Sequence, residues 1–287
     1  MRSAADRREA CGFLTARGLS RRRACVLLRL SRSSLAYRPR ESRALQDAEL
    51  GRQIRDLALE HRRFGYRRIS VMLNRQRRQD GEEPVNEKRV HRLWKKLGLA
   101  LPRRVKRKRP GQGASVPCRA EHPNHVWTYD FVHDFRENGR QLKFLTLVDE
   151  FTRQALAIEV DARLSSRQVI EVLERVAGEH GRPRFLRSDN GPEFIARQLK
   201  QYLAREGCQT RYIDPGSPWQ NAYGESFNGK FRDEFLNQEV FHSVAHARVL
   251  TERWRRYYNT ERPHSSLEYQ TPEEFAGSLA KRGRLAG

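Results

Sequence analysis

The chain has 287 residues, with 57 lysines and arginines against 35 aspartates and glutamates, which gives a formal net charge of +22 at pH 7. The excess is confined to residues 1–120, which hold 33 basic and 11 acidic side chains, whereas residues 121–287 hold 24 of each. This asymmetry excludes a uniformly basic protein of the ribosomal or histone kind. It predicts a basic nucleic-acid-binding region joined to a neutral globular unit.

Several other classes of protein are excluded by the composition. No run of about 18 apolar residues is present, so the sequence predicts no membrane span. A charged and then apolar leader is also missing, which favours the cytoplasm. The four cysteines form no CxxC pair, so neither a disulfide scaffold nor a zinc finger is indicated. No phosphate-binding GxxxxGK[ST] segment occurs, and we expect no nucleotide hydrolysis.

Residues 1–40 are predicted to form short helices in a helix-turn-helix arrangement. Two of them, at 21–28 and 31–37, are joined by a tight turn in which Arg29 takes the place of the usual glycine. The second is short, polar and basic, as a helix that reads a DNA groove should be, and its Arg32 is a candidate DNA contact. An ordinary helical hairpin is the alternative.

Residues 41–100 are predicted to form a second small, all-α, DNA-binding module. Apolar side chains at helical spacing mark amphipathic helices over 45–61 and 66–78, and Asn86 can cap a third helix that ends at Gly98. The turn between the first two helices interleaves basic and aromatic side chains, which suits phosphate contact and base stacking. Its candidate DNA contacts are Arg62, Arg63, Arg67 and Arg68. The alternative is a solvated basic helix surface.

Residues 101–120 are predicted to be an extended basic linker, since they hold no acid and cannot bury a core. Their position between two DNA-binding modules and a neutral domain favours a segment that follows the DNA backbone. The alternatives are a targeting run and a merely solubilising one. The six candidate DNA contacts in the linker are Arg103, Arg104, Lys106, Arg107, Lys108 and Arg109.

Residues 121–280 predict a single α/β domain with C-terminal helices. Strands are expected at 126–135, 143–148, 154–160, 184–188 and 210–213, with Asn138-Gly139 as a hairpin turn. Helices are expected at 165–179, 192–206, 222–238 and 244–259. Three antiparallel strands followed by alternating helices and strands indicate a mixed five-stranded sheet flanked by helices.

Three acidic residues of this domain are candidate metal ligands. Asp130 lies inside an apolar strand, where a carboxylate is costly to bury unless it is paired or binds a metal. Asp189 follows the fourth strand, and ligand sites of open α/β sheets lie at strand ends. Glu225 opens a helix that can pack on the same sheet. Three carboxylates form a hard-oxygen site for Mg²⁺ or Mn²⁺. Alternatively, Asp189 belongs to an ordinary Asp-Asn-Gly turn and Glu225 only complements the helix dipole.

The helix that begins near Ala222 is predicted to have two distinct faces. Its apolar face packs on the core through phenylalanines four residues apart, Phe227, Phe231 and Phe235. Its polar face presents Glu225 together with three candidate DNA contacts, Asn228, Lys230 and Arg232. A metal-binding acid beside phosphate-binding groups suits polynucleotide chemistry.

Four stretches together give the sequence a specific likeness, in order, over about residues 20–276. They are Trp127-Thr128-Tyr129-Asp130, Ser188-Asp189-Asn190-Gly191-Pro192-Glu193-Phe194, residues 217–230, and Tyr258-Asn259-Thr260-Glu261-Arg262-Pro263-His264 with Thr271-Pro272-Glu273-Glu274. The sequence resembles an insertion-sequence transposase of the integrase-like D-D-E type. It is most similar to the OrfB-type protein of bacterial elements that have two overlapping reading frames.

The resemblance implies a ribonuclease-H-like core in which Asp130, Asp189 and Glu225 are the catalytic acids and hold two Mg²⁺ or Mn²⁺ ions. It also implies that Arg232 is the basic residue accompanying the third acid. The implied reaction is cleavage and transfer of DNA strands by direct phosphoryl transfer, without a covalent enzyme intermediate. The implied partners are double-stranded DNA, other copies of the chain in a homo-oligomer, and an upstream OrfA-type protein joined as a fusion. The implied location is the bacterial cytoplasm, in association with the nucleoid.

Other interpretations of the sequence remain open. One is a structure-specific nuclease of the same fold that stops at hydrolysis. Another is a non-catalytic helix-turn-helix regulator that uses only residues 1–100, although such a protein has no need of all three acids. His122 and His125 with Cys118 form the single zinc-like cluster, but without a CxxC pair they are better explained as surface or strand-edge residues. Tyr258 is expected to pack rather than to act as a nucleophile.

Overall fold

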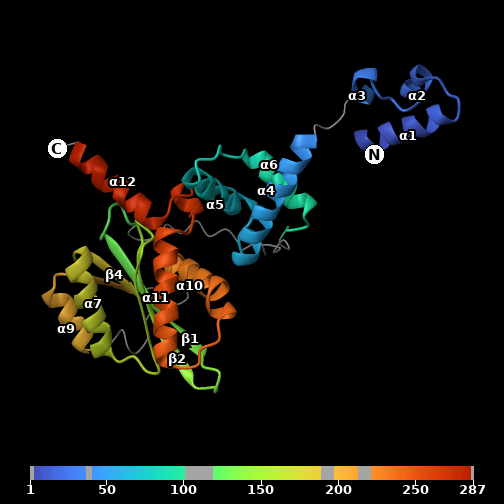
Figure 1. Ribbon diagram of the computed structural model, residues 1–287. Coiled ribbons are helices and arrows are strands. Elements are labelled where there is room, and N and C mark those ends of the chain that lie inside the picture. The colour runs from blue at the N-terminus through green and yellow to red at the C-terminus, as the bar shows by residue number, and fades with distance from the viewer. Residues whose placement is uncertain (1–2, 37–40, 101–118, 189–196, 213–220, 286–287) are drawn as a thin grey trace. The chain divides into compact units, whose positions relative to one another are not determined.

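The computed structural model describes residues 3–36, 41–100, 119–188, 197–212 and 221–285 (Figure 1). These residues belong to two compact units, Met1–Asp56 and Leu57–Gly287, which are described separately. The division falls inside helix α4 (Glu41–Glu60). The expected limits of the domains at residues 40, 100 and 120 therefore remain predictions.

The first unit contains the three short helices α1 (Ala4–Ala16), α2 (Arg21–Leu27) and α3 (Arg32–Ala36). The side chain of Ser20 accepts a hydrogen bond from the backbone of Arg23 and caps α2, as the sequence predicted. Arg29, in the turn between α2 and α3, has a φ of 48°, the left-handed conformation that a glycine usually supplies there. Four buried side chains hold the helices together, namely Cys11, Ala24, Cys25 and Leu30.

The second unit begins with the end of α4, followed by α5 (Tyr66–Gln79) and α6 (Glu87–Lys96). Asn86 caps α6 as predicted, and Gly98 has the positive φ of 68° that ends such a helix. The loop between α5 and α6 is fixed because the side-chain amide of Asn74 both donates to and accepts from the backbone of Val85. Five apolar side chains are buried on the two helices, Ile69, Leu73, Val90, Leu93 and Trp94.

The rest of the second unit is built on a five-stranded mixed sheet with the strand order β3-β2-β1-β4-β5. The strands are β1 (Val126–Phe135), β2 (Gln141–Asp149), β3 (Ala155–Asp161), β4 (Phe185–Ser188) and β5 (Gln209–Tyr212). The first three pair antiparallel, and β4 and β5 run parallel to β1. Three antiparallel strands extended by two parallel ones are the ribonuclease-H-like arrangement that the resemblance implied, so the predicted fold class is confirmed.

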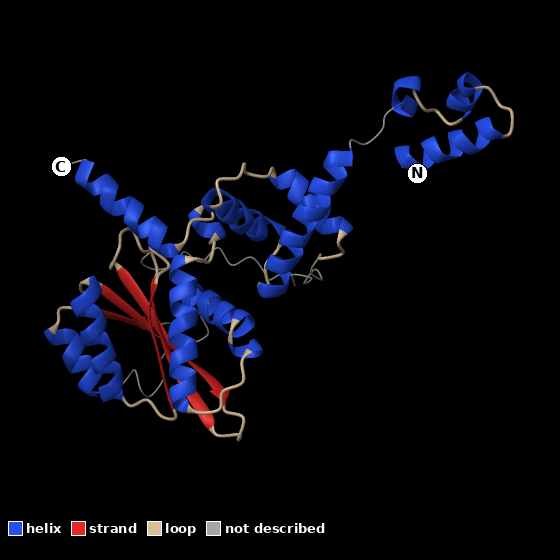
Figure 2. Cartoon of the chain, viewed as in Figure 1, coloured by secondary structure: helices blue, strands red, loops and turns tan. Residues whose placement is uncertain are grey.

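Helices cover both faces of the sheet (Figure 2). On one face, α7 (Ser166–His180) and α9 (Arg197–Arg205) pack on a core that includes Trp127 and Tyr129 of β1. The predicted helix over 192–206 is thus described only from residue 197. The alternation of β1 places Val132 in the opposite core, as a strand requires.

The opposite face is covered by α10 (Ala222–Glu234), the short 3₁₀ helix η2 (Leu236–Gln238) and α11 (Val244–Thr260). Their core is aromatic, because the phenylalanines of α10 pack against Phe144 and Trp254. A single helix to about residue 238 was predicted. The structure instead breaks it at Phe235, whose φ and ψ are −135° and −69° and whose side chain is buried in the core.

The chain ends in the 3₁₀ helix η3 (Ser265–Leu267) and the helix α12 (Pro272–Leu285). Thr271 caps α12 by accepting a hydrogen bond from the backbone of Glu274, whose carboxylate in turn accepts from the backbone of Thr271. Among the helices that the structure describes, none combines the length and the apolar character needed to cross a membrane.

Candidate active site on strand β1 and helix α10

Asp130 lies in the middle of β1, directly opposite Thr146 of β2. Its Oδ1 accepts a hydrogen bond from the backbone of Phe131 at 2.7 Å, and its Oδ2 accepts one from Nδ2 of Asn228 at 2.8 Å. The hydroxyl of Thr146 lies 3.0 Å from Oδ1 of Asn228 and 3.2 Å from the carbonyl oxygen of Asp130. The carboxylate is therefore oriented by a backbone amide of β1 and a side chain of α10, and Thr146 of β2 holds that side chain in place.

Glu225 is exposed in the first turn of α10, three residues before Asn228 and hence on the same side of the helix. A second contact fixes this helix on β1, because the hydroxyl of Thr128 donates to Oδ1 of Asn221 at 2.8 Å in a buried position. Gly224 allows this close approach, since a Cβ there would lie 2.6 Å from the same oxygen. Strand β1 and helix α10 are thus joined by hydrogen bonds at Asn221 and at Asn228, one before and one after Glu225.

The third predicted acid, Asp189, lies outside the described residues. It directly follows β4, which runs parallel to β1 with Arg187 opposite Thr128. No group of three or more histidines, cysteines or acids with the geometry of a metal site occurs among the residues that the structure describes. Because that search does not include Asp189, the complete predicted triad stays a prediction.

A buried ion pair near the carboxyl end of β4 was not predicted from the sequence. Oε1 of Glu150, which follows β2, lies 3.2 Å from Nη1 of Arg187, and their side chains are 0% and 3% exposed. Burial raises the pKa of Glu150 to about 7, against the opposing charges of Arg187 and Arg153. The sequence signal that could have indicated this ion pair is an acid directly after an apolar strand together with an arginine inside a second strand.

The three candidate DNA contacts on α10 all have partners within the chain. Nη2 of Arg232 donates to the carbonyl oxygen of His133 at 2.8 Å, and Nζ of Lys230 donates to the hydroxyl of Ser226 at 2.9 Å. Burial lowers the pKa of Lys230 to about 8, and nearby arginines add to the effect. The side-chain amide of Asn228 donates a hydrogen bond to Asp130. The contact of these three α10 residues with DNA stays a prediction.

The other candidate DNA contacts differ in exposure. Arg32 on α3 and Arg62 after α4 are exposed. Arg67 is also exposed, and its guanidinium donates to the hydroxyl of Tyr66 at 3.2 Å. Arg63 is exposed as well and Arg68 is half-buried, and both contact acids on α10. The remaining six candidates lie outside the described residues, and they are Arg103, Arg104, Lys106, Arg107, Lys108 and Arg109.

Two alternative centres are not supported by their surroundings. The ring of His125 is buried and stacks on that of His122 with a centroid distance of 4.6 Å. His122 is exposed and His125 directly precedes β1, in agreement with the surface or strand-edge positions predicted for them. Cys118 lies outside the described residues. Tyr258 packs edge-on against His264 in the core, and burial raises its pKa, so its hydroxyl stays protonated.

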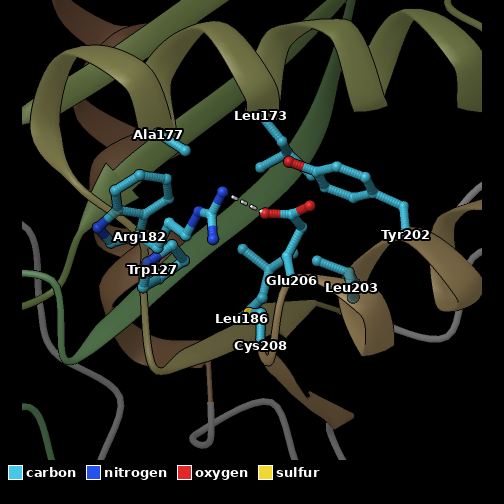
Figure 3. A pocket seen from close by; sticks show the side chains of 10 residues that line it. Trp127, Leu173, Ala177, Arg182, Leu186, Tyr202, Leu203, Glu206 and Cys208 are labelled. Atoms are coloured by element: carbon cyan, nitrogen blue, oxygen red, sulfur yellow. Dashed lines mark ion pairs between the residues drawn. The ribbon is translucent and has the colours of Figure 1, made fainter.

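A small apolar cavity lies between α7, α9 and the strands β1 and β4 (Figure 3). Its volume of about 20 Å³ is enough for no more than about one water molecule. An ion pair of 2.8 Å between Arg182 and Glu206 lies at this cavity, and burial raises the pKa of Cys208, which also lines it, to about 11. A protonated thiol is a poor nucleophile and metal ligand, so Cys208 is not a candidate for either role.

Comparison with known proteins shows which families the chain matches. Integrase core domain families match residues 120–218 and 206–272, and an HTH-like domain family matches residues 44–108. The uncharacterized 31.7 kDa protein of insertion element IS407 from Burkholderia multivorans is 44% identical over 262 residues, which are 90% of this chain and 91% of the relative. The putative transposase InsK of element IS150 from Escherichia coli K12 is 28% identical and covers 79% of this chain and 83% of its own.

A solved structure is also similar at lower identity. A chain of the simian T-cell lymphotropic virus intasome in complex with PP2A regulatory subunit B56 gamma is 16% identical, with a TM-score of 0.48 and 67% of each chain covered. The fold assignment rests on the strand order and the integrase core families.

Proposed function

The chain belongs to the insertion-sequence transposases with an integrase core, and on that premise we propose how it acts on DNA. It is an enzyme of the D-D-E transposase and integrase class. The proposed reaction begins when water attacks a phosphodiester at the end of the element and releases a strand with a free 3′-OH. That 3′-OH then gives up its proton and attacks the phosphorus of a second phosphodiester, so a new P–O bond joins the two strands. The bond from that phosphorus to its original 3′ oxygen breaks, and this oxygen takes up a proton and leaves as a second 3′-OH.

The proposed metal ligands are Asp130, Asp189 and Glu225, and the proposed cofactors are two Mg²⁺ or Mn²⁺ ions. The donor set fits these ions, because carboxylate oxygens are the ligands that hard divalent cations prefer. When bound, such a pair of ions activates the attacking oxygen and stabilises the leaving one.

The observation that carries the proposal is the hydrogen bond of 2.8 Å between Asn228 and Asp130. Because Asn228 is three residues from Glu225, this bond holds the helix of one proposed acid against the carboxylate of another. The backbone amide of Phe131 holds the other oxygen of Asp130. A carboxylate oriented in advance by two donors loses little freedom when it binds an ion, which is what a metal ligand requires.

The neighbouring residues have separate roles in the proposal. Thr146 fixes the amide of Asn228 through its hydroxyl, so Asn228 presents its NH₂ group rather than its oxygen to Asp130. Arg232 ties α10 to the carbonyl oxygen of His133, farther along β1. These residues orient the carboxylates and act through them.

The proposed partner is double-stranded DNA at the ends of the element and at its target. Support comes from the charge of residues 1–120, which hold 33 basic and 11 acidic side chains, and from the HTH-like family match at residues 44–108. Two DNA ends must meet for strand transfer, so we propose a homo-oligomer on DNA. We further propose that a fusion with an upstream OrfA-type protein completes end recognition, and that the protein acts at the nucleoid in the bacterial cytoplasm.

The proposal is tested with a duplex oligonucleotide that carries the element's own end and is labelled on its 5′ end. With Mg²⁺ we expect first a shortened labelled strand and then a longer strand made by joining, and both should disappear when the ion is chelated. Shortened strands without any joined product would instead support a nuclease that stops at hydrolysis. Binding of the duplex without either product would support a non-catalytic regulator and overturn the proposal.

A further inference from the structure

The turn that joins α4 to α5, together with the start of α5, contacts α10, the helix that carries Glu225. Nη2 of Arg63 lies 2.9 Å from Oδ2 of Asp233, and Nη1 of Arg68 lies 3.8 Å from Oε1 of Glu234. Both acids are in the last turn of α10, where the helix dipole also favours cations. Two arginines that the sequence assigns to DNA are therefore matched by two acids of the catalytic domain.

Phe64, which lies between these two arginines in the sequence, is buried at this contact. The ring of Phe64 is only 2% exposed, with the guanidinium of Arg68 5.1 Å and that of Arg262 5.4 Å from its centroid. Arg262 is itself fully buried and forms two hydrogen bonds with the carboxylate of Glu234, at 2.6 Å and 2.5 Å. Glu234 thus pairs with Arg262 of the catalytic domain and with Arg68 of the helical module.

A second group of contacts lies beside the first. The ring of His61 stacks on Tyr257 of α11 with a centroid distance of 5.6 Å, and its Nδ1 lies 3.1 Å from the hydroxyl of that tyrosine. Nη2 of Arg75 on α5 lies 2.6 Å from Oε2 of Glu274 at the start of α12, and its guanidinium also donates to the carbonyl oxygens of Glu261 and Tyr269. Carbonyl oxygens and a matching carboxylate form a receptor for this one side chain.

We propose that these residues form a docking clamp that fixes the helical module, from Leu57 to Gly98, on the catalytic domain of the same chain. The clamp consists of an arginine and aromatic edge on the module and an acidic edge on α10 and α12. Asp233, Glu234 and Glu274 form the acidic edge. The partner that this surface fits is the chain's own helical module.

The clamp has a consequence for DNA that rests on the proposed function. DNA held by the module would enter the catalytic domain in one orientation relative to Glu225, because Asp233 and Glu234 of the acidic edge belong to the same helix. Arg63 and Arg68 would serve the clamp, while the neighbouring Arg62 is exposed, contacts no acid among the described residues, and stays available to phosphate.

The test measures distances within the full chain without any DNA, so it does not depend on strand cleavage. Nitroxide labels are attached to cysteines placed at the exposed positions Lys95 on α6 and Gln141 on β2, in a chain whose natural cysteines are replaced. Pulsed electron paramagnetic resonance then gives the distribution of distances between the two labels. We expect a single narrow distribution for the otherwise unchanged chain.

The clamp is opened and restored with charge exchanges at its two accessible ion pairs. R63E with R75E places acids against Asp233 and Glu274, and we expect the distribution to broaden at least twofold. Adding D233R and E274R reverses both pairs, leaves the buried Arg262 contact unchanged, and should restore the narrow distribution.

The matched control is R62E with R78E, which makes the same change of charge at exposed arginines of the same module. We expect its distribution to match that of the unchanged chain. The clamp would be overturned if R63E with R75E stayed narrow, if the exchanged pairs failed to restore the narrow distribution, or if the control broadened as much.

Discussion

Replacement of Glu234 by Gln tests the ion pair of the buried Arg262, whose side chain is 0% exposed. The change keeps the size of the side chain and one acceptor oxygen, but it removes the negative charge. The guanidinium of Arg262 is fully buried and loses one of its two short hydrogen bonds to this carboxylate. Its charge would then stay in the protein interior without a counterion.

The expected loss of stability follows from this burial. Removing one partner of a buried ion pair typically costs about 3–5 kcal/mol, because the other charge is left uncompensated. Gln keeps one hydrogen bond, so we expect E234Q to lower the free energy of unfolding by about 3 kcal/mol. Replacing Glu234 and Arg262 together by Met removes both charges and should cost less than E234Q alone.

The assay is urea unfolding followed by tryptophan fluorescence, to which Trp254 contributes from the core beside α10. The control is Glu171→Gln, because Arg167 and Glu171 form an ion pair of 3.1 Å with exposed fractions of 86% and 57%. Such exposed pairs contribute about 0–1 kcal/mol. Equal losses in E234Q and in the control would refute the reasoning about the buried pair.

Three further outcomes are expected. Asn228→Ala removes a donor to Asp130 and should slow strand cleavage about 10- to 100-fold with little change in DNA affinity, measured by single-turnover rates and titration. Gly224→Ala places a Cβ 2.6 Å from Oδ1 of Asn221 and should destabilise the fold by about 1–3 kcal/mol in urea; an unchanged midpoint would contradict the close approach. Burial raises the pKa of Glu150 to about 7, so the folded state binds more protons than the unfolded one between pH 4.5 and 7. Stability should therefore fall by up to about 3 kcal/mol as the pH rises through this window, and Glu150→Gln should remove that fall.

The sheet and its helices were largely predictable because their patterns are local. β1 was predicted at the residues where it occurs, since large apolar side chains alternate along it and a strand has a period of two. The cap at Asn86 and the end of α7 at Gly181 were also readable, because caps depend on a few adjacent residues. The break at Phe235 was not, since it follows from the packing of that ring in the core.

The candidate site was predictable in its residue types and faces. The spacing of Phe227 and Phe231 fixes which side of α10 is buried, and Glu225 and Asn228 must then share another side. What the spacing does not contain is the partner of each polar group. The contact of Asn228 with Asp130 joins residues that are 98 positions apart in the sequence.

The function of individual arginines was the least predictable part. Arg62 and Arg63 are adjacent and chemically identical, and a basic turn alone assigns both to DNA. The structure separates them because Asp233, 170 positions away, lies against Arg63 only. A charge pattern thus predicts that a region binds nucleic acid, but the partner of each side chain depends on tertiary contacts.

The most direct test of the central claim is the strand-cleavage and joining assay with Asp130→Asn, Asp189→Asn and Glu225→Gln, each in Mg²⁺. The matched control is Asp134→Asn, which removes a carboxylate four residues after Asp130 on the same strand. We expect each of the three variants to lose cleavage and joining by at least about 1000-fold while still binding DNA, and the control to stay active. Cleavage at the unchanged rate by any of the three would contradict the assignment of the catalytic acids.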